Sequence, residues 1–242
     1  MLDQFSRTRL LLGDSALEAL HRARVAIFGV GGVGGYACEA LARCGVGAFD
    51  IIDNDVVSLT NVNRQIIATH ATLGRSKTEV MRDRMLDIYP DAVIRIHNRF
   101  VLPENIEEFP WSEYSYVVDA IDTVSAKLSL IEAARQNSVP VISAMGAGNK
   151  LQPERFRVSD ITETRTCPLA RVMRRELRKR GIEHVKVVWS DEPPVRADVS
   201  APQDEAIPDR KRSIPGSIAF APAVAGLLLA SQVVRDLTSR MA

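Results

Sequence analysis

The chain has 242 residues, a length that fits one large α/β domain or one domain with an extension. Its composition of 46% hydrophobic and 25% charged residues is that of a folded globular protein and excludes a chain disordered throughout. Lys and Arg total 31, Asp and Glu total 30, and the net charge is +1. This balance predicts neither a nucleic-acid nor a membrane partner, so any such surface must be local.

The cysteine count and the apolar runs indicate in which cellular compartment the protein folds and whether it spans a membrane. Three cysteines without a Cys-x-x-Cys pair exclude a disulfide framework and the usual structural zinc cages, and they fit a reducing cytosol. The N-terminus lacks the continuous apolar core of a signal peptide. The most apolar late run, 218–230, contains Pro222 and is shorter than the roughly 20 residues needed to span a bilayer. We therefore expect a cytoplasmic protein with no clear membrane span.

The first half of the chain alternates between strand and helix patterns. Residues 24–30 are apolar and β-branched and end in glycines, as a buried parallel strand does. A helix at 36–43 and a strand at 48–53 complete one βαβ unit. Further strands are expected at 93–100, 114–121 and 139–145, with helices at 75–89 and 125–137. The alternation predicts an α/β fold: a Rossmann-like, mostly parallel sheet with helices on both faces.

The pattern changes after Gly148, where we expect an extension of the same domain. It should contain an antiparallel strand at 155–161, a helix at 169–180, a strand at 185–189 and an apolar tail helix at 222–237. Residues 191–212 are poor in apolar residues and contain four prolines, which predicts a long mobile loop.

The first strand ends in a glycine-rich turn, Gly29-Val30-Gly31-Gly32-Val33-Gly34. Glycines let the backbone turn tightly and approach a phosphate, and the following helix offers free N–H groups and the positive end of its dipole. Asp53 ends the second strand, 24 residues after Gly29, where a carboxylate can accept both ribose hydroxyls. Nucleotide binding is favoured over a ligand-free turn, with NAD, FAD and ATP all open.

The loop after Asp53 carries a second acid, Asp55, with several amides and an arginine, more than a dehydrogenase needs. Arg64 offers a guanidinium fork for phosphate oxygens. Asn61 can hydrogen-bond an α-phosphate or a substrate carboxylate. Lys77 stands at a predicted helix start, against the dipole preference, which makes sense if a phosphate lies there. Taken singly, these residues also suit an ordinary polar loop and an exposed lysine.

Two further acids, Asp119 and Asp122, lie at the carboxyl end of the fourth predicted strand, where open parallel sheets bind ligands. Asp122 could hold Mg²⁺, which binds through one or two carboxylates together with phosphates. The alternative is that Asp122 caps the helix that follows.

Taken in order, GVGGVG, D-x-D-x-V-S-x-x-N-x-x-R-Q, G-x-x-K and D-x-x-D resemble the ubiquitin-activating-enzyme superfamily, whose bacterial members include the ThiF, MoeB and HesA proteins. The resemblance covers about residues 7–150 and implies an enzyme that adenylates a carboxylate with MgATP and releases pyrophosphate. It implies an ATP-binding Rossmann-like adenylation core over 7–150, with 151–242 as an extension of the same domain.

The resemblance also implies roles for single residues. The cofactor-binding set would be Gly29, Gly31, Gly32, Gly34, Asp53, Asp55, Asn61, Arg64, Gln65, Lys77, Asp122 and Arg7. Within it, Asp53 would bind the ribose, Asp122 would hold Mg²⁺, and Arg64, Lys77 and Asp122 would be catalytic. Arg7 matches an arginine that in relatives reaches the ATP of the partner subunit, which implies a homodimer; a mobile terminal arginine is the alternative.

The chain departs from the sulfur-carrier-activating branch, because ThiF and MoeB carry two Cys-x-x-Cys pairs for zinc. Instead TNVNRQ at 60–65, DAID at 119–122, GAG at 146–148 and PGSIAF at 215–220 resemble the tRNA threonylcarbamoyladenosine dehydratases, known as TcdA or CsdL. That branch implies ATP-dependent cyclisation of threonylcarbamoyladenosine beside the tRNA anticodon. A sulfur-relay protein is a candidate partner.

A tRNA substrate needs a positive surface, and the predicted helix at 169–180 supplies a local excess of positive charge. Glu176 and Glu183 are the only acids among seven cations, Arg171, Arg174, Arg175, Arg178, Lys179, Arg180 and Lys186. A solvated charged helix is the usual meaning of such a run, but the implied RNA substrate favours RNA binding.

Three other functions stay open. The first is adenylation of the C-terminus of a ubiquitin-like sulfur-carrier protein. The second is an NAD-dependent oxidoreductase, which Asp53 allows but which leaves Arg64, Lys77 and Asp122 unexplained. The third is a catalytically silent binding module. Distant relatives use a cysteine to accept the acyl group; here we expect Cys167 to be a free thiol.

Overall fold

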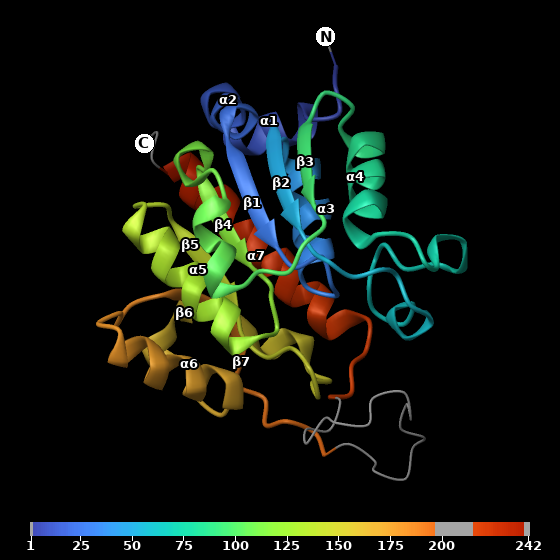
Figure 1. Cartoon of the computed structure of the whole chain (residues 1–242). Helices are drawn as coiled ribbons and strands as arrows, with labels where there is room; N and C mark the ends of the chain where they lie inside the picture. Colours follow the sequence, from blue (N-terminus) through green and yellow to red (C-terminus); the bar gives the residue numbers. More distant parts are fainter. Residues whose placement is uncertain (1, 197–214, 240–242) are drawn as a thin grey trace.

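Seven strands form a single sheet in the order β3-β2-β1-β4-β5-β7-β6 (Figure 1). The computed structural model describes residues 2–196 and 215–239. Neighbouring strands are parallel except for the edge pair β6 and β7, which confirms the predicted sheet and its antiparallel extension. The strands are β1 (Arg24–Phe28), β2 (Ala48–Ile52), β3 (Val93–His97), β4 (Tyr116–Asp119), β5 (Val141–Ala144), β6 (Phe156–Asp160) and β7 (Lys186–Ser190).

Helices cover both faces of the sheet. Buried residues of α2, α3, α4 and α7 pack on one face, and those of α5 and α6 on the other. The helices are α1 (Ser6–Leu12), α2 (Asp14–Arg22), α3 (Gly34–Cys44), α4 (Lys77–Ile88), α5 (Val124–Gln136), α6 (Pro168–Lys179) and α7 (Phe220–Ser239). Short 3-10 helices are η1 (Leu59–Asn61), η2 (His70–Thr72), η3 (Pro103–Glu108), η4 (Trp111–Glu113), η5 (Pro153–Arg155) and η6 (Ile161–Glu163). The sequence did not predict α1 and α2, because 7 and 9 residues give little helical periodicity.

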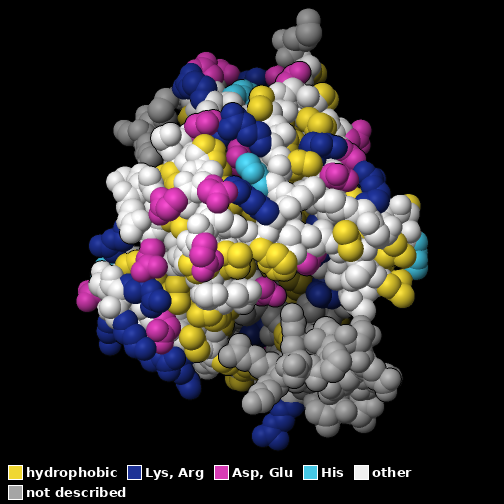
Figure 2. Space-filling model, in the orientation of Figure 1, with side chains coloured by type: hydrophobic (Ala, Val, Ile, Leu, Met, Phe, Trp, Pro, Cys, Tyr) yellow, Lys and Arg dark blue, Asp and Glu magenta, His cyan; other side chains and the backbone are white. Residues whose placement is uncertain are grey.

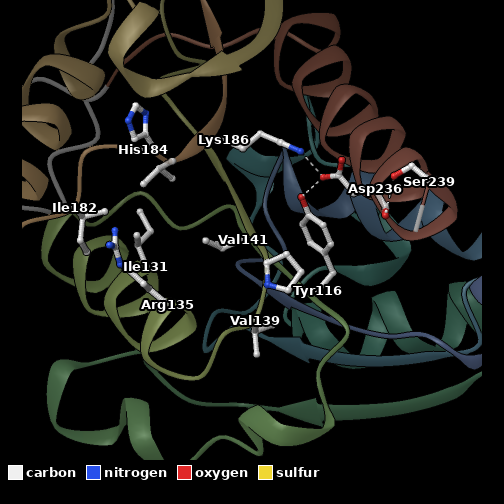
Figure 3. A pocket seen from close by; sticks show the side chains of 12 residues that line it. Tyr116, Ile131, Arg135, Val139, Val141, Ile182, His184, Lys186, Asp236 and Ser239 are labelled. Atoms are coloured by element: carbon white, nitrogen blue, oxygen red, sulfur yellow. Dashed lines mark hydrogen bonds and ion pairs between the residues drawn. The ribbon is translucent and has the colours of Figure 1, made fainter. Parts of the chain in front are cut away.

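The C-terminal helix α7 crosses one face of the sheet and packs closely against α3. A Cβ at position 226 would lie 2.3 Å from the carbonyl oxygen of Val33, so only glycine fits this crossing. Asp236 accepts hydrogen bonds from Tyr116 of β4 at 2.6 Å and from Lys186 of β7 at 2.5 Å (Figure 3). By length and hydropathy α7 could cross a bilayer, but 56% of that stretch is buried inside the protein. The apolar tail helix expected at 222–237 is therefore present, and it packs on the protein's own core.

A buried carboxylate, Asp50, links the first three strands of the chain. It accepts hydrogen bonds from Arg24 Nη1 at 2.7 Å, His97 Nε2 at 2.8 Å and the Tyr114 hydroxyl at 3.2 Å. Burial alone would raise the pKa of Asp50, but the hydrogen bonds from His97 and Arg24 outweigh it and hold the pKa below its ordinary value.

Because the folded-state pKa of Asp50 is lowered, its contribution to stability is present above the unfolded pKa of about 3.9 and is lost as the pH falls through the folded pKa. We expect the free energy of unfolding, measured with urea, to fall as the pH is lowered from about 5 to below 4. Asp50→Asn should cost about 3 kcal/mol at pH 7 and flatten that fall. The exposed Asp91→Asn is the control; an unchanged slope in Asp50→Asn would contradict the assignment.

Candidate nucleotide site at the carboxyl edge of the sheet

The glycine turn after β1 packs directly against the turn after β4. Gly29 has a φ of +93°, and a Cβ there would lie 2.7 Å from the carbonyl oxygen of Ala120. At Gly34 a Cβ would lie 1.8 Å from the carbonyl oxygen of Gly29. The N-cap of α3, Val33, has no side-chain hydrogen bond to the helix. The turn therefore requires glycine. At the start of α3 the Gly35 N–H already donates to the Gly31 carbonyl at 3.0 Å, so the other N–H groups of the first turn and the helix dipole are what a phosphate could use.

Asp53 braces the glycine turn while keeping room for a ligand. One carboxylate oxygen accepts the Val30 N–H at 2.7 Å, and the other accepts the Asp55 N–H at 2.8 Å. An ionised carboxylate has about four acceptor positions, so both oxygens retain a lone pair. Asp53 thus stands at the end of β2 in the position that sequence spacing predicts for ribose binding.

The next pair of predicted residues forms an ion pair at the start of α4. The ammonium of Lys77 lies 2.7 Å from Asp55 Oδ2, and the lysine side chain is only 7% exposed. The Lys77 N–H also donates to the Asp55 carbonyl at 3.1 Å. The carboxylate explains how a lysine is tolerated at a helix N-terminus, and a phosphate arriving there would share or replace it.

Arg64 lies on the loop between Asp55 and Lys77, close to the glycine turn. Its Nη1 donates to the Thr60 carbonyl at 2.7 Å and to Asn63 Oδ1 at 2.9 Å. A Cβ at Gly32 would lie 3.5 Å from the Arg64 side chain. Partial burial lowers the pKa of Arg64, yet a guanidinium stays charged in proteins. Neighbouring Asn61 is buried and accepts the Ser58 N–H at 3.2 Å, which shapes the loop.

Gln65 holds a buried amide that lacks a partner. Its Oε1 has no hydrogen-bond partner among the described residues, and its Nε2 lies 4.0 Å from where a Cβ of Gly31 would be. A buried polar atom without a partner is costly, and a ligand is one of the few ways to satisfy it. The amide oxygen therefore marks the space beside the glycine turn as a place for a ligand group that donates a hydrogen bond, such as a hydroxyl or an amino group.

The segment 215–222 closes the site from the C-terminal half of the chain. Asn63 Nδ2 donates to the Ser217 carbonyl at 3.0 Å, and Pro222 would lie 3.3 Å from a Cβ at Gly32. Asn149 exchanges hydrogen bonds with Gly216 at 2.7 Å each. Sequence reasoning noted PGSIAF as a motif but did not assign Asn63, Asn149 or Ser217 to the site.

The turn after β4 is fixed by a fully buried carboxylate. Asp119 accepts from Lys127 Nζ at 2.9 Å, from Ser143 Oγ at 2.6 Å and from the Ile121 N–H at 3.2 Å. Lys127 is fully buried too, and it was missed at the sequence level. The sequence did contain a signal for it, since Lys127 stands among the apolar residues of a predicted helix. A lysine buried in this way needs a carboxylate partner, which would have pointed to an acid nearby.

Asp122 stands at the far end of this turn with an exposed carboxylate. Within the described chain its carboxylate accepts one hydrogen bond, from Thr123 Oγ1 at 3.3 Å. The N-cap of α5 is Thr123, so the alternative of Asp122 as the cap is wrong. The carboxylate is available to a cation at the edge where Asp53 and the glycine turn lie.

Arg7 is not brought to this site. It is exposed on α1, which packs on α2 before the amino end of β1. Phe5, two residues earlier, contacts His21 and Tyr89 at that same end of the sheet. Within one chain Arg7 therefore lies at the end of the sheet opposite the nucleotide site (Figure 1).

The predicted cationic residues lie on the outer face of α6, and Figure 2 shows Lys and Arg gathered there. Ala170, Met173 and Leu177 bury the inner face. A hollow of about 410 Å³ is lined by arginines and a lysine alone. Arg171 and Arg178 are exposed and have no ion pair within the described part of the chain. We call this surface the basic strip: Arg171, Arg174, Arg175, Arg178, Lys179 and Arg180.

The basic strip begins beside the nucleotide site. Cys167, the N-cap of α6, is buried, and its Sγ lies 3.6 Å from where a Cβ of Gly146 would be, in the loop after β5. As expected, it is a free thiol.

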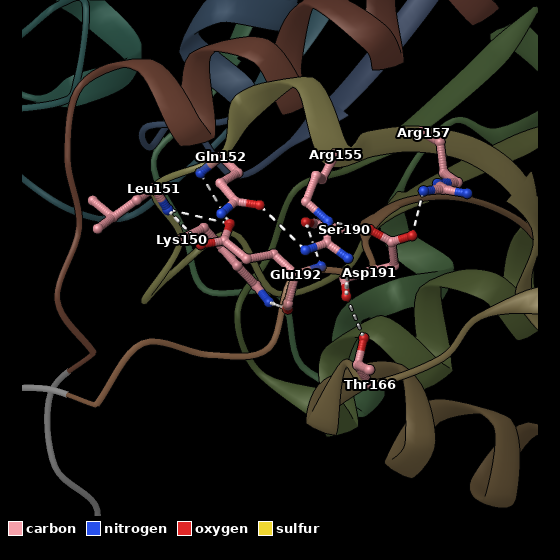
Figure 4. A network of polar contacts seen from close by, with 9 residues as sticks. All are labelled: Lys150, Leu151, Gln152, Arg155, Arg157, Thr166, Ser190, Asp191 and Glu192. Atoms are coloured by element: carbon pink, nitrogen blue, oxygen red, sulfur yellow. Dashed lines mark hydrogen bonds and ion pairs between the residues drawn. The ribbon is translucent and has the colours of Figure 1, made fainter.

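The loop predicted at 191–212 begins with anchored residues. The Glu192 carboxylate accepts N–H groups of Leu151 and Gln152 at 3.0 Å each, and Lys150 donates to its carbonyl (Figure 4). Asp191 pairs with Arg155 at 2.7 Å. The expectation of mobility is therefore wrong at positions 191 and 192, because buried polar contacts hold them; positions 197–212 lie outside the described residues.

Comparison with known proteins gives a consistent set of relatives. The ThiF family model matches residues 5–241. The chain is 44% identical to the tRNA threonylcarbamoyladenosine dehydratase of Bacillus subtilis over 242 residues, covering 98% of this chain and 95% of that one. It is 41% identical to the Escherichia coli protein of the same name, over 72% of this chain and 65% of the other. The crystal structure of E. coli TcdA in complex with ATP superposes with a TM-score of 0.87 at 33% identity, covering 98% and 95% of the two chains.

The Asp119–Lys127 pair generates a stability prediction. Lys127→Met should cost about 3–5 kcal/mol, because it leaves a buried carboxylate without its ammonium. The double variant Asp119→Asn/Lys127→Met removes both charges and should recover most of that loss. Urea unfolding at pH 7 measures both, with the exposed Lys179→Met as control. A double variant no more stable than Lys127→Met would show that the pair is not the source of the cost.

Proposed function

The chain belongs to the ThiF family, and we propose that it acts as an ATP-dependent tRNA threonylcarbamoyladenosine dehydratase, like its curated relatives. One structural observation carries the proposal: Asp53, Arg64 and Gln65 all lie against the glycine turn, where a nucleotide would be bound, and the Gln65 amide oxygen is buried without a partner among the described residues. A related TcdA has been solved with ATP and another crystal of it with AMP, the substrate of carboxylate adenylation and the group that the acyl adenylate later releases.

The ATP would lie across the carboxyl edge of the sheet, with its phosphates over the N-terminus of α3. Asp53 accepts the ribose hydroxyls with its remaining lone pairs. The phosphates are bound by Asn61, Arg64, Gln65 and Lys77, and the glycines at 29, 31, 32 and 34 allow their close approach. Asp55, which holds Lys77 at 2.7 Å, keeps that ammonium in place until the phosphates arrive.

Asp122 is the residue that would hold Mg²⁺. The described residues contain no cluster of three or more His, Cys, Asp or Glu side chains that could bind a metal. That agrees with the way Mg²⁺ binds nucleotides, through one or two carboxylates and the phosphates themselves. The exposed and nearly uncontacted carboxylate of Asp122 fits this role. When bound, the ion neutralises phosphate charge.

The chemistry follows from the weakness of a carboxylate as an electrophile. A carboxylate oxygen of the threonyl group attacks the α-phosphorus of ATP, and the bond to the bridging oxygen breaks to release pyrophosphate. A nitrogen of the same modification then attacks the acyl carbon, loses its proton and displaces AMP, which keeps the former carboxylate oxygen. The base has lost the elements of water. Arg64 and Lys77 stabilise charge at the α-phosphate, and ring closure needs mainly positioning.

Further parts of the proposal concern assembly and substrate contacts. Arg7 lies far from the site of its own chain, so it can reach ATP only from a second copy, which supports a homodimer. The basic strip binds tRNA phosphates. A sulfur-relay protein is a candidate partner, and we place the enzyme in the cytoplasm. Residues 7–150 form the adenylation core, and 151–242 extend it with the surface that meets RNA.

The two rival enzyme classes fit the chain less well. An enzyme that adenylates a sulfur-carrier protein would need the same core, but the two zinc-binding Cys-x-x-Cys pairs of that branch are missing from the sequence. An NAD-dependent oxidoreductase would use Asp53 and the glycine turn, yet it would have no use for Arg64, Lys77 and Asp122 together.

The test is an incubation of purified protein with ATP and threonylcarbamoylated tRNA. We expect AMP, pyrophosphate and the cyclised nucleoside in equal amounts. Mass spectrometry of the digested tRNA should show that this nucleoside is lighter by one water than its precursor. Arg64→Ala should lower kcat roughly 10²- to 10³-fold by removing a charge that stabilises the transition state. The matched control is Arg82→Ala on α4, a half-buried arginine that pairs with the neighbouring Asp83 at 3.0 Å.

Three results would contradict the proposal. No ATP consumption with modified tRNA would end the dehydratase assignment, and pyrophosphate exchange that depends on a protein ending in Gly-Gly would revive the sulfur-carrier function. An Arg64→Ala variant with unchanged activity would point to a silent binding module or a different phosphate site.

A further inference from the structure

A second pocket, of about 490 Å³, lies at the amino ends of β4, β5 and β7, away from the nucleotide site. We call it the distal pocket (Figure 3). Ile131, Val141 and Ile182 contribute apolar surface to it, and Arg135 and Lys186 are its cationic lining residues, with His184 beside them. Nothing in the proposed chemistry uses this pocket.

In the distal pocket the carboxylate of Asp236 already has hydrogen-bond partners, whereas the guanidinium of Arg135 has none among the described residues. Asp236 accepts hydrogen bonds from Tyr116, Lys186 and Gln232, at 2.5–2.7 Å. His184 is 76% exposed and lies 3.4 Å from Asp160. The Arg135 guanidinium is exposed and makes no ion pair or hydrogen bond within residues 2–196 and 215–239. The pocket therefore offers a free guanidinium beside apolar side chains, a combination that suits a phosphate with its attached sugar.

The distal pocket continues the basic strip. The strip starts where α6 begins, beside Gly146 at the nucleotide site, and α6 has 12 residues, which span roughly 18 Å at 1.5 Å per residue. At its far end Arg180 pairs with Glu132 of α5 at 3.1 Å, three residues before Arg135 on the same helix. Cations of α6 thus lead from the carboxyl edge of the sheet toward the distal pocket, and the acids among them, Glu176 and Glu132, are already paired. A ligand that uses both ends must be a long polyanion.

We infer that the distal pocket binds the sugar–phosphate backbone of the RNA substrate at a point remote from the nucleotide being modified. The inference rests on the proposed function, because it takes the substrate to be an RNA. Arg135 binds a phosphate through its planar fork, and the apolar residues contact the ribose. The contact gives affinity for long RNA without taking part in the reaction.

The experiment compares a long and a short substrate in the Arg135→Ala variant. The long one is threonylcarbamoylated tRNA; the short one is a trinucleotide with the modified adenosine at its centre, too short to reach the pocket. We expect the Kd of tRNA, by fluorescence anisotropy, and its KM to rise roughly tenfold, with kcat unchanged. The salt dependence of tRNA binding should weaken by about one unit of slope. The KM of the trinucleotide should change less than about twofold. Arg82→Ala, on the opposite edge of the protein, is the control for loss of a positive charge.

Equal losses on both substrates, or no loss on tRNA, would overturn the inference. If the proposed function itself were wrong, the result would differ, because the wild-type protein would then cyclise neither the tRNA nor the trinucleotide. In that case the fluorescence anisotropy measurement still decides whether Arg135 binds RNA, because a binding measurement needs no catalysis.

Discussion

The close approach of Gly29 to the carbonyl of Ala120 is the constraint on which the site depends. A side chain at position 29 would meet that oxygen at 2.7 Å, so the turn after β1 and the turn after β4 can touch only through glycine. The contact brings Asp53, the N-terminus of α3 and Asp122 to one edge of the sheet. The fully buried Asp119–Lys127 pair then fixes the second turn. Two backbone turns, each held by a carboxylate, form the floor of the nucleotide site.

The charges of the site divide into held and free groups. Asp53, Asp55 and Lys77 already bind one another or the backbone, so their positions exist before a ligand binds. Asp122 and the Gln65 amide have few or no partners in the described chain, and these are the groups that a nucleotide would satisfy. Because these charged groups are in place before the ligand binds, they need to move little during the reaction. The same division recurs on the basic strip, where Glu176 holds Arg175 and Lys179 but Arg171 and Arg178 are unpaired among the described residues.

Sequence reasoning succeeded where chemistry is local. The strands, the glycine turn and Asp53 follow from spacing within one βαβ unit, and the structure has each of them within a few residues of the prediction. It failed where contacts join distant parts of the chain: Asn63 meets Ser217 across 154 residues, and Lys127 meets Asp119 and Ser143 only after folding. The anchoring of Asp191 and Glu192 depends likewise on Lys150 to Arg155 some 40 residues earlier. A pattern of polar residues cannot show which partners they find.

Conversion of a carboxylate into an acyl adenylate in this pocket can be followed with tRNA whose threonyl carboxylate carries ¹⁸O, turned over with unlabelled ATP. We expect one ¹⁸O atom in the AMP released and none in pyrophosphate, because the bond that breaks at ring closure joins the acyl carbon to the former carboxylate oxygen. Unlabelled AMP alongside complete cyclisation would mean that the carboxylate never bonds to the α-phosphorus, and would contradict the account.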